Sequence, residues 1–109
     1  AMNSRSLKLK LYVGEVELGI PKGFLIEKNS SDKRNQGFHQ AVVVSRDYQK
    51  QMEITYDYEV QDIYIHIFVR DPISKNLDYR GDTLLPAGST PAQIREKFNE
   101  LMGQLKKEK

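Results

Sequence analysis

The sequence predicts an α+β fold, in which a meander-like antiparallel sheet of about five to six strands carries one C-terminal α-helix on one face. In several short runs, apolar residues alternate with polar ones, which is the period of a half-buried strand. Residues that favour turns separate these runs. In the last run, apolar residues recur every three or four positions, the spacing of an amphipathic helix.

The length and composition fit one small domain. The chain has 109 residues, and we expect 1–109 to form a single α+β domain, with 1–6 as a disordered or cloning-derived N-terminus. The 17 basic and 15 acidic side chains give a net charge of +2, which is too even to indicate nucleic acid, a membrane surface or an acidic substrate. No apolar run approaches the roughly 20 residues that span a bilayer. No secretory signal is visible either, so we expect a cytoplasmic protein without a membrane partner.

The N-terminal segment reads as strand. Leu7 to Leu18 alternates apolar and charged residues around Gly14, which can serve as a bulge or a turn. This segment is therefore either one bent strand or a tight hairpin. Phe24–Lys28 is a second short apolar run.

A polar loop and another strand follow. Asn29–Gly37 is rich in turn formers and has no periodicity, which predicts a surface loop. Phe38–Ser45 predicts a strand, and its consecutive Val42, Val43 and Val44 indicate that both faces are covered there.

The central pair of runs predicts a β-hairpin, because only Glu59–Asp62 lies between them. The apolar positions are Met52, Ile54, Tyr56 and Tyr58 in the first run, and Ile63, Ile65, Ile67 and Val69 in the second. With Tyr58 opposite Ile63, the other pairs are Tyr56 with Ile65, Ile54 with Ile67 and Met52 with Val69. Every apolar side chain then lies on one face, and a slip of one residue would expose a whole row to water.

The C-terminal third predicts an edge strand and a helix. Proline has no N–H for the ladder, so Asp71–Pro72 ends the hairpin, and Leu77–Leu85 adds a short edge strand broken by Gly81. Thr90–Lys107 is the helix. Its capping box consists of Thr90 and Gln93 around Pro91, and its apolar stripe consists of Ile94, Phe98, Leu101 and Leu105. This stripe has to cover the apolar face of the sheet.

Motifs for catalysis or metal binding are missing. The sequence has no cysteine, no glycine-rich phosphate loop, no nucleophile elbow and no HExxH motif, and its two histidines, His39 and His66, are far apart. We therefore expect a protein that is not an enzyme and that has no catalytic residues, metal or cofactor. The one conceivable catalytic start is a pocket that holds His66 beside Asp57.

The second face of the central hairpin is the candidate binding surface. It combines aromatic residues, acids and an arginine, a composition typical of binding hot spots. The residues are Glu53, Thr55, Asp57, Tyr64, His66, Phe68 and Arg70. Two structural alternatives are open. Cross-strand pairs such as Asp57 with Tyr64 or Glu53 with Phe68 could serve only to stabilise the hairpin, or the N-terminal segment could fold over this face.

Part of the chain resembles small bacterial immunity proteins of polymorphic and contact-dependent toxin systems. In those proteins a "GF" start leads to a polar loop, a strand, a segment of the "YD" type and a closing strand of branched residues. The matching pieces here are Gly23-Phe24, the loop to Gly37, the strand through Val44, Ile54–Asp57 and Ile63–Val69. The resemblance implies a stoichiometric inhibitor and supplies no catalytic residues. Two features differ: such proteins often begin with a helix, and those that block nucleases are often acidic.

We therefore expect a small protein-binding module whose partner is another protein, most concretely a toxin domain that the chain neutralises by direct binding. A first alternative is a nucleic-acid-binding accessory protein of phage or plasmid origin, because Lys33, Arg34 and the C-terminal lysines are basic and the strands carry aromatic residues. A second alternative is a subunit of a homo-oligomer or larger assembly that pairs through an exposed edge strand.

Overall fold

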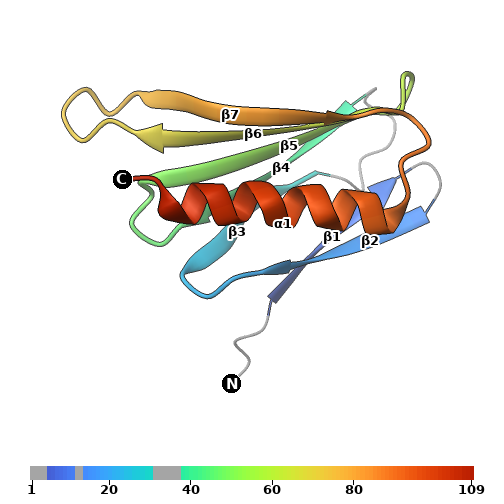
Figure 1. Ribbon diagram of the computed structural model, residues 1–109, viewed down its shortest axis with the longest axis horizontal. Helices are drawn as coiled ribbons and strands as arrows, with labels where there is room; N and C mark the ends of the chain where they lie inside the picture. Colours follow the sequence, from blue (N-terminus) through green and yellow to red (C-terminus); the bar gives the residue numbers. More distant parts are fainter. Residues whose placement is uncertain (1–4, 12–13, 31–37) are drawn as a thin grey trace.

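The computed structural model describes residues 5–11, 14–30 and 38–109. Together they form seven antiparallel strands and a C-terminal helix, which confirms the predicted fold class. The elements are β1 (Arg5–Leu11), β2 (Gly14–Ile20), β3 (Phe24–Asn29), β4 (Phe38–Ser45), β5 (Lys50–Asp57), β6 (Ile63–Arg70), β7 (Leu77–Leu85) and α1 (Pro91–Lys107). Strands β3 to β7 form one meander in chain order, while β1 and β2 pair separately (Figure 1).

The N-terminal segment is a hairpin, the second of the two predicted possibilities. Gly14 has φ +138° and starts β2. Lys8 pairs with Glu17 in the register, so opposite charges face each other on the outer side while the leucines are buried on the inner side. Strand β1 begins at Arg5, so part of the segment 1–6 belongs to the sheet, and residues 1–4 lie outside the described residues.

The central hairpin has the predicted faces but a different register. Tyr56, not Tyr58, lies opposite Ile63, and the pairs Ile54–Ile65 and Met52–Ile67 follow. The turn between β5 and β6 causes this difference in register. The carboxylate of Asp57 accepts hydrogen bonds from the backbone N–H groups of Glu59 and Val60 at 2.8 and 3.3 Å, and β5 ends at Asp57. Because the shift is an even number of residues, every apolar side chain keeps its predicted side of the sheet.

Tyr58 therefore belongs to the turn, where it joins two parts of the molecule. Its ring meets Tyr56 edge-on, with 4.8 Å between the ring centroids. Its hydroxyl donates to the carbonyl of Lys10 at 2.8 Å. The turn of the central hairpin is thus tied to the N-terminal hairpin.

Strand β4 is buried on both faces where the three valines lie, as the sequence predicts. Val43 is fully buried among the core residues, and Val42 and Val44 are buried on the opposite side. The predicted loop starts later than Asn29, which is the last residue of β3, and Ser30 exchanges hydrogen bonds with Gln40. The rest of the predicted loop, 31–37, lies outside the described residues.

Gly81 does not break the last strand. β7 is continuous over nine residues and contains a bulge. Gly81 pairs with Ile67 and Tyr79 with Phe68, so Arg80 between them has no opposite residue. The bulge explains why the period-two pattern is hard to follow in this part of the sequence.

The helix is confirmed together with its cap. The backbone N–H of Gln93 donates to the hydroxyl of Thr90 at 3.2 Å, and the backbone N–H of Thr90 donates to the side-chain oxygen of Gln93 at 2.9 Å. All four residues of the predicted stripe are buried, and Met102 joins them. Helix α1 contacts β2, β5, β6 and β7. It is not long and apolar enough to cross a membrane.

The apolar faces of β1, β2, β5, β6 and α1 meet in one core on one side of the five-stranded sheet. The leucines of β1 and β2, the isoleucines of β5 and β6 and the stripe of α1 form a single buried cluster. Both the helix and the N-terminal hairpin therefore lie on the same side of the sheet (Figure 1). None of the described elements lies over the other side.

Two glycines give a matched test of the backbone. Gly103 lies in the helix, and a Cβ there would meet nothing within 4 Å. We expect Gly103→Ala to raise the free energy of unfolding by about 0.5–1 kcal/mol, because alanine has the higher helix propensity. Gly88 has φ +90°, which a side chain strains, so Gly88→Ala should lower it by about 1 kcal/mol or more. Urea denaturation of both variants measures the changes, and two changes of the same sign would contradict this explanation.

Candidate functional site

The side of the five-stranded sheet that faces away from α1 is the candidate site, and we call it the open face. It is formed by the alternate residues of β5, β6 and β7 whose side chains point away from the core. Its central residues are Gln51, Glu53, Thr55, Tyr64, His66, Phe68, Tyr79, Asp82 and Leu84. The structure thus brings five of the seven predicted site residues together at the centre of the open face.

The residues of the open face lie in rows that cross the strands. His66 on β6 lies between Glu53 on β5 and Asp82 on β7. Tyr64 has Thr55 on one side, and its other neighbour is Leu84. The expected cross-strand pairs, Asp57 with Tyr64 and Glu53 with Phe68, are wrong because the register of the hairpin differs from the predicted one by two residues.

Four rings form a continuous aromatic row on the open face. The centroids of Tyr64 and His66 are 5.6 Å apart and those of His66 and Phe68 are 6.2 Å apart, and in both pairs the rings are stacked. Tyr79 meets the ring of Phe68 edge-on at 6.4 Å. Tyr64 remains 40% exposed and Tyr79 56% exposed, so this apolar area is accessible to a partner.

Two carboxylates flank the aromatic row. Glu53 accepts a hydrogen bond from the side-chain amide of Gln51 at 2.7 Å, and Asp82 lies 3.8 Å from Nε2 of His66. Within the described part of the chain, no lysine or arginine forms an ion pair with either acid. Both carboxylates can therefore accept hydrogen bonds from a cationic or neutral donor of a partner.

Asp82 also affects its neighbour Tyr79. The pKa of the Tyr79 hydroxyl is raised, first by desolvation and then by the hydrogen bond to Asp82 and the negative charge of this carboxylate. Tyr79 thus stays protonated and holds a hydrogen-bond donor against Asp82.

The two other predicted site residues lie at opposite ends of the strands and stabilise turns. Asp57 binds the backbone of the β5–β6 turn, as described above. Arg70 donates to the carbonyl of Tyr48 at 3.1 Å and to the carbonyl of Lys75 at 2.7 Å, which joins the β4–β5 and β6–β7 turns. Replacing either residue would disturb a turn as well as the surface.

The structure does not form the catalytic arrangement that the sequence left open. The neighbouring carboxylate of His66 is that of Asp82, while Asp57 binds turn amides. Among the described residues, no three histidine or acidic side chains are grouped so that they could hold a metal ion.

The proposed covering of this surface by the N-terminal segment is also wrong, since β1 and β2 belong to the core on the opposite side. Sequence reasoning missed the three residues that β7 contributes, Tyr79, Asp82 and Leu84. A strand was predicted there, but the bulge at Arg80 conceals which of its side chains share a face.

Comparisons with protein-family models, with curated proteins and with solved structures found no match to this chain.

The side-chain interaction between Tyr79 and Asp82, both on β7, gives a direct test of the geometry of the open face. Asp82→Asn should lower the pKa of Tyr79, because it removes the negative charge that opposes ionisation of the phenol. Asp78→Asn, on the same strand, is the matched control and should leave the pKa of Tyr79 unchanged. NMR titration of ¹³C-labelled tyrosine rings measures both, and an equal response to the two substitutions would contradict the placement of Asp82.

Proposed function

We propose that the chain is a protein-binding module whose open face docks onto a partner protein. The observation that carries this proposal is the exposed aromatic row of Tyr64, His66, Phe68 and Tyr79, which none of the described elements covers. Tyrosine is enriched among the residues that dominate binding energy, because its large rigid ring loses little conformational entropy.

The partner class that we propose is a toxin domain, neutralised by stoichiometric binding in the bacterial cytoplasm. The support is the resemblance of Gly23–Val69 to immunity proteins, together with a surface that suits tight association. In such a complex the aromatic row would provide the buried centre of the interface. Glu53 and Asp82 would select the partner by charge and hydrogen bonding.

The proposal is tested by co-expression with candidate toxins, which are the proteins encoded next to the gene of this chain. The wild-type chain should restore growth of a bacterial host that expresses its cognate toxin, and the two purified proteins should form a complex of fixed stoichiometry in light scattering. Failure of the chain to protect against any neighbouring candidate, with both proteins expressed, would overturn the proposed function.

Substitutions on the open face locate the interface. We expect Tyr64→Ala and Glu53→Lys each to weaken the affinity for the toxin about tenfold or more, since central aromatic and charged contacts contribute most to binding. The control is Ile73→Ala, because Ile73 is 91% exposed in the β6–β7 turn, away from the open face. Calorimetry gives the affinities, and thermal unfolding checks that each variant folds. If none of the open-face substitutions changes the affinity of the complex, the interface lies elsewhere on the chain.

A further inference from the structure

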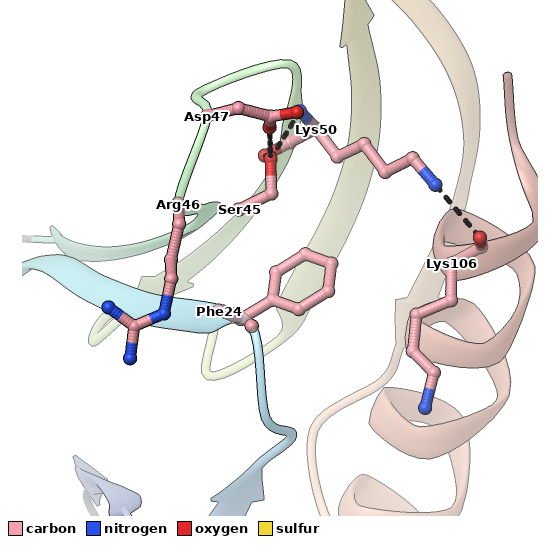
Figure 2. A pocket seen from close by; sticks show the side chains of 7 residues that line it. Phe24, Ser45, Arg46, Asp47, Lys50 and Lys106 are labelled. Carbon is pink, nitrogen blue, oxygen red and sulfur yellow. Dashed lines mark hydrogen bonds between the residues drawn. The ribbon is translucent and has the colours of Figure 1, made fainter.

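A hollow lies at the C-terminal end of α1, on the opposite side of the sheet from the open face. Its volume is about 390 Å³. Three separate parts of the chain meet around it: the start of β3, the β4–β5 turn and the last turn of the helix (Figure 2). The lining residues are Gly23, Phe24, Ser45, Arg46, Asp47, Lys50 and Lys106.

One of the three cations that line this hollow, and the one acid, already form hydrogen bonds within the chain. The ammonium group of Lys50 donates to the backbone carbonyl of Lys106 at 2.8 Å, where it complements the negative end of the helix (Figure 2). The carboxylate of Asp47 accepts from the hydroxyl of Ser45 at 2.7 Å and from the backbone N–H of Gln49 at 3.1 Å. These hydrogen bonds, that of Ser45 above all, lower the pKa of Asp47 and hold its carboxylate in the turn.

The side chains of the other two cations have no partner among the described residues. Among the described residues, neither the guanidinium of Arg46 nor the ammonium of Lys106 forms an ion pair or a side-chain hydrogen bond. The two free cations are 60 positions apart in the sequence, and only the fold brings them to one hollow.

A second hollow of about 290 Å³ continues along the helix and shares Lys106 with the first. It is lined by Gly19, Ile20, Pro21, Asn99, Met102, Gly103 and Lys106. Gly103 lies here with no atom within 4 Å of the position of a Cβ, so no tight contact inside the chain requires a glycine in the helix. A glycine does allow the backbone of a bound segment to approach the helix closely.

We propose that these two hollows form one groove that binds an acidic peptide segment of a protein partner. Carboxylates of the segment contact Arg46 and Lys106, an apolar side chain enters the hollow beside Phe24, and its main chain passes over Gly103. A peptide fits better than a nucleic acid, because part of the lining, at Phe24, is apolar and suits an apolar side chain but not a phosphodiester backbone. This site is separate from the open face and does not depend on the function proposed for it.

The test uses a displayed library of random peptides, selected on the purified chain. Peptides that combine acidic and apolar residues should be enriched. The affinity of a purified, enriched peptide should fall about tenfold or more in the double variant Arg46→Glu, Lys106→Glu, because both charge contacts become repulsive. Gly103→Leu should also abolish binding by filling the groove, while its higher helix propensity keeps the fold stable, as circular dichroism would verify.

Two controls distinguish this groove from other sites. Arg95→Glu reverses one positive charge at the other end of the helix, half the charge change of the double variant, and should leave the affinity unchanged. Tyr64→Ala on the open face should also have no effect. Three results would overturn the proposal: no enrichment of acidic peptides, binding that survives in both groove variants, or binding that is lost in Tyr64→Ala. If no peptide binds, but a single-stranded oligonucleotide binds the wild-type chain and not the double variant, then the ligand of the groove is a nucleic acid and the peptide proposal is overturned.

Discussion

The structure depends on the burial of one face of the β5–β6 hairpin. Ile54, Ile65 and Ile67 are between 0 and 2% exposed, and they lie at the centre of a cluster that includes both the helix stripe and the leucines of the N-terminal hairpin. Burying a side chain of this size contributes about 1.5–3 kcal/mol. Because period-two alternation gives the chain one such face, α1 and the β1–β2 hairpin both pack on that side, and none of the described elements covers the opposite side of the sheet.

The sequence predicts the features that depend on local patterns. The faces of β5 and β6, the capping box at Thr90 and the helix stripe all follow from spacing and residue type, and all are present in the structure. The register of the central hairpin was not predictable in this way, because two registers separated by two residues bury the same side chains. The turn decides between them, through the hydrogen bonds that Asp57 makes to backbone N–H groups.

The candidate site was predictable on β5 and β6 but not on β7. Alternation identifies Tyr64, His66 and Phe68 as residues of one face, whereas the bulge at Arg80 shifts the alternation and conceals Tyr79. The groove beside the helix could not be found at all from the sequence. An even charge balance along the chain does not reveal that Arg46, Lys50 and Lys106 meet at one end of the fold.

Copies of the chain could associate through the open face or through the outer edge of β7. The edge of β7 is protected against pairing with another strand. β7 ends the five-stranded sheet, so no strand of the described part of the chain lies beside its outer backbone groups. The bulge at Arg80 interrupts the regular ladder, and the charged residues Asp78 and Asp82 lie on the same strand. Bulges and charges are the usual means by which edge strands avoid pairing with another chain. An assembly built by strand addition at β7 therefore has less support than docking through side chains of the open face. There the aromatic rings provide contact area, and docking requires no new backbone hydrogen bonds.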